Sequence, residues 1–399
     1  MNINTRLQLS SMMFLQFFIW GAWFVTASTY LNSIGFSGID IGKAYSTMPW
    51  GAIISPFFIG MIADKYFSAE KVMGVMHIAG GFIMYYASGI TDPNIFFWTV
   101  LLYAICYMPT LALVNSISFN QMTDTGKEFP SIRVWGTIGW IGAGLLIGFL
   151  DIESTSIPMK IAAGVSMAMG LFSFTLPKTP PKSSDTKVSI SNILGLKALS
   201  LMREKSFAIF VISSFLISIP LTFYYNFTNL FLNENEIENA AGKMTMGQMS
   251  EILFMILMPF FFKRLGVKKM LLVGMMAWVV RYVLFATGNN EALVFMFYLG
   301  IILHGICYDF FFVTGQIYVD KKASGDIQAS AQGFITLVTY GVGMLLGSWV
   351  SGFVVEFFSI GSDETAVHDW PSIWYVPAGM ALLITLIFAL LFKDNKQVS

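Results

Sequence analysis

Apolar residues along the chain gather in long runs that short polar segments separate. Each run is about 20 residues long, which is the length an α-helix needs to cross the hydrocarbon core of a bilayer. None of the runs alternates between apolar and polar positions, so the pattern favours helices over the strands of a membrane barrel. The sequence predicts twelve spans, at residues 9–31, 42–63, 72–91, 95–118, 132–150, 158–177, 206–232, 245–262, 269–288, 292–315, 328–356 and 371–392.

The composition supports a membrane protein. Of the 399 residues, 56% are hydrophobic and only 12% are charged, whereas soluble domains carry about 25% charged residues. Lys plus Arg and Asp plus Glu both number 23, so no net positive field attracts nucleic acid. The two cysteines, Cys106 and Cys307, lie inside apolar runs, which excludes a disulfide scaffold or a zinc motif. We therefore expect an all-α polytopic membrane protein.

The positions of Lys and Arg predict the orientation of the spans. With the N-terminus in the cytoplasm, eighteen of the 23 basic residues fall in cytoplasmic segments and three in external ones. The other two, Arg133 and Arg281, lie within predicted spans. Because cytoplasmic loops carry the excess of Lys and Arg, we expect both termini in the cytoplasm.

The longest polar stretch, residues 178–205, separates the first six spans from the last six. It contains two prolines, several serines and six basic residues, as flexible linkers do. We predict an N-terminal six-helix bundle at residues 1–177, a cytoplasmic linker at 178–205 and a C-terminal six-helix bundle at 206–399.

Three short motifs recur between the two halves at nearly the same spacing. The pairs are Pro56-Phe57-Phe58 with Pro259-Phe260-Phe261, Ile105-Cys106-Tyr107 with Ile306-Cys307-Tyr308, and the Gly142–Gly148 segment with the Gly341–Gly347 segment. An internal repeat of six spans keeps the same membrane orientation, so the halves are predicted to be parallel repeats. This is the plan of the major facilitator fold, in which the substrate site lies at the midplane between the halves.

Ionisable residues inside spans cost about 2.5–3.5 kcal/mol each on insertion scales, so they mark functional positions. The candidates are Arg133, Glu251, Arg281, Asp309, His304 and Glu356. The sequence contains no G-x-S-x-G, P-loop or H-E-x-x-H motif, and its three histidines are scattered. We therefore expect no enzyme activity, no metal site and no cofactor.

The fifth span places Arg133, Thr137 and Trp140 on one helix face, since they stand at positions i, i+4 and i+7. Together they offer a fixed cation, a hydroxyl group and a large aromatic ring to a ligand. The alternative is that Arg133 snorkels to the cytoplasmic interface while Trp140 only packs.

Gln248 and Glu251 share one face of the eighth span. A carboxylate accepts hydrogen bonds and an amide both donates and accepts, so the pair suits the recognition of hydroxyl groups. The alternative is that both face water at the outer interface.

Asp309 follows Tyr308 and precedes three phenylalanines in the tenth span. A carboxyl group among aromatic side chains pays a desolvation penalty for its charge, which suits it to binding and releasing protons. A candidate ion pair with Arg281 of the ninth span is the structural alternative, and the two roles are compatible.

These segments resemble the bacterial nucleoside:H+ symporter family of the major facilitator superfamily. The resemblance rests on Phe129-Pro-Ser-Ile-Arg133-Val-Trp135-Gly136-Thr137-Ile-Gly139, Tyr107-Met-Pro-Thr-Leu-Ala-Leu-Val-Asn115, Gln248-Met-Ser-Glu251, Tyr308-Asp309-Phe-Phe and Ala329-Ser-Ala-Gln332-Gly333. It runs from Trp20 through the twelfth span and so covers nearly the whole chain.

The resemblance implies a nucleoside site with contributions from four spans. Its residues would be Arg133, Thr137 and Trp140 of the fifth span, Thr222 and Tyr225 of the seventh, Gln248 and Glu251 of the eighth, and Tyr308 and Asp309 of the tenth, with Asp309 and Glu251 coupling the proton. The known members have Phe at the position of Trp140, Gln and Asn at the positions of Thr222 and Tyr225, and Tyr at the position of His304.

The sequence therefore predicts a proton-coupled nucleoside importer that works by alternating access in the bacterial inner membrane, as a monomer in a lipid bilayer, with the proton as coupling ion and no other cofactor. One alternative is a sugar or glycoside symporter of the same fold. A second, of a different class, is a nutrient sensor that has lost transport.

Overall fold

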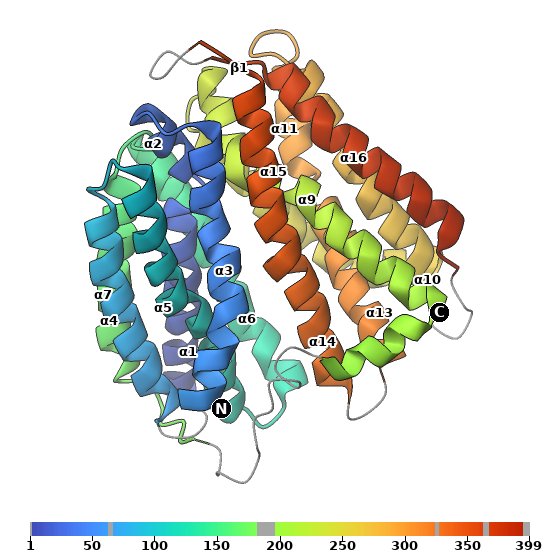
Figure 1. Ribbon diagram of the computed structural model, residues 1–399. Coiled ribbons are helices and arrows are strands. Elements are labelled where there is room, and N and C mark those ends of the chain that lie inside the picture. Colours follow the sequence, from blue (N-terminus) through green and yellow to red (C-terminus); the bar gives the residue numbers. More distant parts are fainter. Residues whose placement is uncertain (1, 63–66, 182–195, 324–326, 362–366, 394–399) are drawn as a thin grey trace. The chain divides into compact units, whose positions relative to one another are not determined.

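The computed structural model describes residues 2–62, 67–181, 196–323, 327–361 and 367–393. These residues are almost entirely helical (Figure 1). They form two compact units, the first of residues 1–36 and 43–188 and the second of residues 37–42 and 189–399. Of the predicted linker, residues 182–195 lie outside the described ranges, and its end forms the 3₁₀ helix η1 (Leu196–Arg203).

The helices of the first unit follow its predicted spans, except that the first span is broken at residues 24–26. They are α1 (Ile3–Trp23), α2 (Ala27–Ser33), α3 (Gly38–Ile62), α4 (Ala69–Ala87), α5 (Pro93–Asn120), α6 (Thr125–Leu150) and α7 (Ile157–Ser173). The first residues of α3, up to Gly42, belong to the second unit.

Glycines allow α1 and α6 to pack closely. A Cβ atom added at Gly139 of α6 would lie 2.2 Å from the backbone oxygen of Phe14 in α1. Only a residue without a side chain fits this crossing, as is common where helices pack within a membrane. The crossing places the face of α6 that carries Arg133 and Trp140 against α1.

A buried polar network joins four helices of the first unit. Gln16 of α1 donates from Nε2 to Thr110 Oγ1 of α5 (2.7 Å) and accepts at Oε1 from His77 Nε2 of α4 (2.9 Å). The Nδ1 atom of His77 lies 3.1 Å from the hydroxyl of Ser166 in α7. Because an amide oxygen only accepts, Nε2 of His77 carries the proton. The Ser166 hydroxyl also donates to the backbone oxygen of His77 at 3.0 Å. Gln16 therefore ties helices together, as expected of polar groups in a helical membrane bundle.

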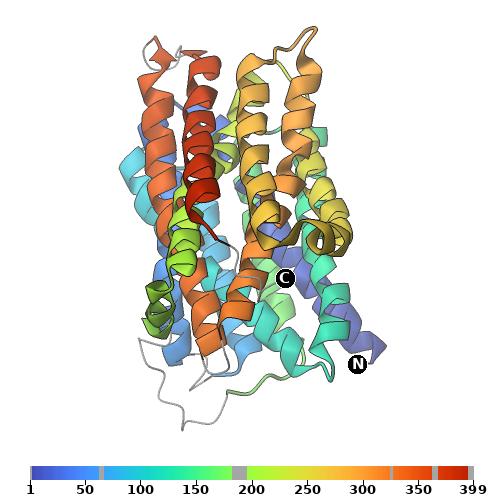
Figure 2. The ribbon, with the colours of Figure 1, turned by 90° about the vertical axis from the view of Figure 1, so that its right-hand side faces the viewer.

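The second unit holds the predicted spans seven to twelve. Its elements after η1 are α9 (Lys205–Glu234), α10 (Ala240–Thr287), α11 (Val294–Ile302), α12 (His304–Tyr308), η2 (Asp309–Val313), α13 (Thr314–Lys322), α14 (Gln328–Thr336), η4 (Leu337–Gly343), α15 (Met344–Phe357), β1 (Ser359–Ile360), β2 (Val367–His368) and α16 (Trp370–Leu391). The long helices of this unit run side by side (Figure 2).

Helix α10 covers two predicted spans and bends sharply between them. Gly266 has φ +65° and ψ 177°, a conformation that glycine adopts without steric cost. Two segments are π-helical, η2 in the tenth span and η4 in the eleventh. Such segments are rare and occur often at functional sites.

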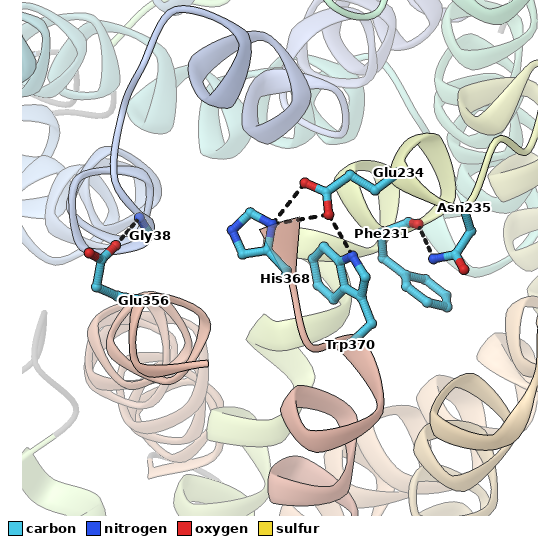
Figure 3. Close-up of polar contacts among 7 residues, drawn as sticks. All are labelled: Gly38, Phe231, Glu234, Asn235, Glu356, His368 and Trp370. Carbon is cyan, nitrogen blue, oxygen red and sulfur yellow. Dashed lines mark hydrogen bonds and ion pairs between the residues drawn. The ribbon is translucent and has the colours of Figure 1, made fainter. Parts of the chain in front are cut away.

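A carboxylate joins the end of α9 to the start of α16. His368 of β2 approaches Glu234 with Nδ1 2.8 Å from Oε1, and Trp370 donates from Nε1 to Glu234 Oε2 at 2.8 Å (Figure 3). Strands β1 and β2 pair antiparallel between α15 and α16. The contact between the imidazole and the carboxylate and the indole hydrogen bond hold β2 and the start of α16 against α9.

Eight helical stretches among the described residues are long and apolar enough to cross a membrane, and one of them is α10 with its two spans. The prediction of an all-α polytopic membrane protein is confirmed.

Candidate functional site

Glu251, His304 and Tyr225 meet inside the second unit. Oε2 of Glu251 on α10 lies 4.0 Å from Nε2 of His304 on α12. The hydroxyl of Tyr225 on α9 lies 3.4 Å from the same nitrogen atom. His304 is fully buried, whereas Glu251 is partly exposed. A carboxylate, an imidazole and a phenol from three helices thus converge on one point.

Tyr308 and Tyr340 extend this cluster across the two π-helical segments. Their hydroxyl groups are hydrogen bonded to each other, Tyr308 at the end of α12 and Tyr340 within η4. The ring of Phe312 lies 5.4 Å from that of Tyr308 and 5.6 Å from that of Tyr340. The arrangement presents aromatic faces beside hydrogen-bonding groups, which is the equipment for a flat polar ligand.

Asp309 is the first residue of η2 and is fully buried. Neither of its carboxylate oxygens has a hydrogen-bond partner among the described residues. A buried carboxyl group without a partner is costly when charged. This environment suits the predicted role in binding and releasing a proton.

Arg281 is also fully buried, but it is not hydrogen bonded to Asp309. Its Nε donates to the backbone oxygen of Gly300 at 2.9 Å, and its guanidinium lies 4.1 Å from the ring centre of Tyr224. Its two terminal nitrogens have no partner among the described residues. The candidate ion pair between Arg281 and Asp309 is therefore not formed in this conformation.

The remaining candidates of the second unit differ in exposure. Gln248 is half-buried on α10, one turn before Glu251. Thr222 is fully buried, and its hydroxyl donates to the backbone oxygen of Ile219 in its own helix. The neighbouring Asn226 donates to Ser348 and Ser351 of α15. The polar groups of Thr222 and Asn226 are thus engaged in helix packing here.

In the first unit, Arg133 and Trp140 both contact aromatic rings of α1. The guanidinium of Arg133 lies 4.3 Å from the ring centre of Phe17. The ring of Trp140 meets that of Trp20 edge to face, with centroids 5.5 Å apart. Arg133, Thr137 and Trp140 are all half-buried.

Sequence reasoning did not single out Tyr340, Phe17 or Tyr224. The internal repeat did not identify Tyr340 either, because the shift of 199 residues that matches Gly142 with Gly341 pairs Trp140 with Thr339. Phe17 and Tyr224 stand in aromatic-rich spans, where no pattern separates a site residue from packing. No group of three metal-binding side chains occurs within the described part of the chain.

Comparison with known proteins gives a family. The family model described as nucleoside H+ symporter matches residues 1–397. The xanthosine permease of Escherichia coli K12 is 36% identical, over 99% of this chain and 97% of that protein. The nucleoside permease NupG of the same organism is 34% identical, over 98% of this chain and 96% of that protein.

The structure gives the same result. Two crystal structures of the nucleoside transporter NupG superpose with TM-scores of 0.92 and 0.90, each covering 98% of this chain and 100% of that chain. The predicted major facilitator fold and the resemblance stated from the sequence motifs are both confirmed, and the protein is a transporter rather than an enzyme. The chain belongs to the nucleoside:H+ symporter family.

Proposed function

We propose that this protein imports nucleosides together with protons across the bacterial inner membrane, as a monomer with both termini in the cytoplasm. The observation that carries the proposal is the family match over residues 1–397, together with relatives that are named for nucleoside transport. Transport follows alternating access in this proposal.

In this proposal the nucleobase stacks on aromatic rings, and its polar edge is hydrogen bonded. Trp140 and Tyr308 offer aromatic faces, and stacking of a base on such a ring is worth about 1–3 kcal/mol in other base-binding proteins. Arg133 and Thr137 supply donors and a hydroxyl to the edge of the base. Half-burial of Arg133, Thr137 and Trp140 supports this assignment.

The ribose is bound by the polar groups of α10. Gln248 and Glu251 provide an amide and a carboxylate one turn apart, which match a pair of neighbouring hydroxyl groups. Tyr225 adds a phenol to this group, since both Tyr225 and Glu251 lie close to Nε2 of His304. Thr222 completes the set that we assign to the substrate, in a conformation where its hydroxyl leaves the backbone oxygen of Ile219.

Asp309 carries the coupled proton, and Glu251 assists it. One proton moving inward gains about 2.3 kcal/mol per 100 mV of membrane potential and about 1.4 kcal/mol per unit of pH gradient. At 100 mV and one pH unit, this free energy supports accumulation of several hundredfold. The free energy of one proton moving inward is therefore sufficient to drive nucleoside import against a concentration gradient.

The test is uptake of labelled uridine and adenosine into proteoliposomes, with and without an imposed inward proton gradient. We expect the gradient to drive accumulation above equilibrium. Equilibration without accumulation would leave nucleoside transport but remove proton coupling. If neither nucleoside enters, and a galactoside or another sugar does, the substrate class proposed here is wrong.

A further inference from the structure

His304 occupies a position in the proposed site where its imidazole is only partly satisfied. Its Nε2 faces Glu251 Oε2 at 4.0 Å and the Tyr225 hydroxyl at 3.4 Å. Its Nδ1 is buried without a hydrogen-bond partner among the described residues. A buried polar side chain in this state is costly and calls for a functional reason.

The described surroundings of His304 contain two carboxyl groups, a guanidinium group and several phenols. From α9, Tyr224 stacks on the imidazole with ring centroids 5.0 Å apart, and Tyr225 meets it edge to face. From α10 come Glu251 and the guanidinium of Arg281, which lies 4.1 Å from the ring centre of Tyr224. After His304 in the chain come Cys307, Tyr308, which is hydrogen bonded to Tyr340, and Asp309 at the start of η2.

The charges around the imidazole allow a proton on it only while Glu251 is ionised. The Arg281 cation repels a second positive charge in this buried region, whereas the Glu251 carboxylate attracts one. A protonated imidazole closing the gap of 4.0 Å to a hydrogen bond would form an ion pair with Glu251. A proton on Glu251 itself would instead remove a carboxylate acceptor from the site.

We propose that His304 takes up a transported proton at Nε2, so that Glu251 stays ionised when the site is proton-loaded and its carboxylate oxygens can accept hydrogen bonds from the hydroxyl groups of the nucleoside. This inference rests on the proposed function and adds a second proton position to that of Asp309. Because linkage is reciprocal, a proton that orders the Glu251 carboxylate tightens nucleoside binding, and bound nucleoside favours the proton.

The experiment measures uridine binding to the purified full-length protein between pH 5 and pH 8. Wild type is compared with His304→Gln and His304→Tyr. Tyrosine keeps an aromatic ring on Tyr224 but holds no positive charge. The control is His368→Gln, which makes the same change in a second His–Glu pair of this unit, at 2.8 Å from Glu234 (Figure 3). His368 is not among the residues assigned to the substrate.

We expect wild type and His368→Gln to bind uridine more tightly as the pH falls, by up to about tenfold in Kd per pH unit for each proton taken up. In His304→Gln and His304→Tyr the Kd should depend less steeply on pH than in wild type, because only Asp309 remains to take up a proton, or should rise at low pH where Glu251 itself protonates. Calorimetry in two buffers of different ionisation enthalpy should show proton uptake on binding that both variants reduce.

The inference is overturned if His304→Gln or His304→Tyr tightens with falling pH as wild type does. If one of these two variants does not give a monodisperse protein, the pH dependence of the other variant tests the inference. If wild type binds neither uridine nor adenosine at any pH, the proposed function is wrong. If wild type binds uridine and the variants keep its pH dependence, only the role of His304 is wrong.

Discussion

Glu356 of α15 accepts a hydrogen bond at Oε2 from the backbone N–H of Gly38, the first residue of α3, at 2.8 Å (Figure 3). The two residues are 318 positions apart in the chain. The N–H groups of the first helical turn have no partner within the helix, and the helix dipole favours negative charge there. Glu356 therefore stabilises the start of α3 from another helix, which accounts for one ionisable residue within a predicted span.

Replacing Glu356 tests this contact. We expect Glu356→Ala to lower the free energy of unfolding by about 1–2 kcal/mol, since a charge-assisted hydrogen bond and a favourable dipole interaction are both lost. Glu356→Gln keeps an acceptor and should lose less. Thermal unfolding in detergent measures both, with Glu238→Ala as the control at an exposed glutamate. An Ala variant as stable as wild type would show that water replaces the carboxylate at no cost.

The close approach of α3 to α15 yields a second prediction. A Cβ atom at Gly42 would lie 2.5 Å from the backbone oxygen of Ser348 and 2.9 Å from Cα of Gly352. Backbone atoms cannot swing aside, so we expect Gly42→Ala to destabilise the protein by about 1–3 kcal/mol and to reduce transport. At Gly379 of α16 an added Cβ meets nothing within 4 Å.

Gly379→Ala is the matched control and should be neutral or stabilising by up to about 1 kcal/mol, because alanine is the better helix former. Melting temperature and initial rate of uridine uptake are measured for both variants. Equal effects at Gly42 and Gly379 would mean that the contact between α3 and α15 does not depend on the absence of a side chain.

Hydropathy predicted where the helices lie but not how they begin, bend or end. The second span was placed from residue 42, whereas α3 starts at Gly38. There Ser37 and Asp40 bond each other, with the Ser37 hydroxyl donating to Asp40 Oδ2 at 2.7 Å. Such caps are polar, so a search for apolar runs does not detect them. It does not detect the π-helical turns η2 and η4 either, because a bulge changes the hydrogen bonding of a helix without changing its composition.

For the candidate site, helical spacing was enough to group residues on one face, as with Arg133 and Trp140. It could not supply partners from other helices, since contacts such as that of Glu251 with His304 depend on how α10 and α12 pack. Nor could it decide between Arg281 and a proton as the partner of Asp309. Two buried groups of opposite charge suggest a pair, but here Arg281 turns to Gly300 and Tyr224.

Asp309→Asn separates coupling from binding. Asparagine keeps the size of the side chain but cannot exchange a proton, so we expect uphill accumulation of uridine driven by a proton gradient to fall to the equilibrium level. Counterflow, in which external label exchanges with internal unlabelled uridine and needs no net proton movement, should persist. Both are measured in the same proteoliposomes. Full uphill accumulation by Asp309→Asn would assign the coupled proton elsewhere.

Trp140→Ala tests whether the indole binds the nucleobase or only packs against Trp20. If it stacks on the base, the lost 1–3 kcal/mol corresponds to an affinity for uridine that is about 5- to 150-fold weaker. Affinity for free ribose, which has no ring to stack, should change little. Trp140→Phe keeps an aromatic face and should retain most of the affinity.

Competition against labelled uridine gives these affinities, and Trp98→Ala is the control because Trp98 of the same unit is 67% exposed. Packing alone would act through the fold of the first unit and so would weaken the binding of every ligand, ribose included. Equal losses for uridine and ribose in Trp140→Ala would therefore assign Trp140 to packing. A loss confined to ligands with a base would assign it to the base.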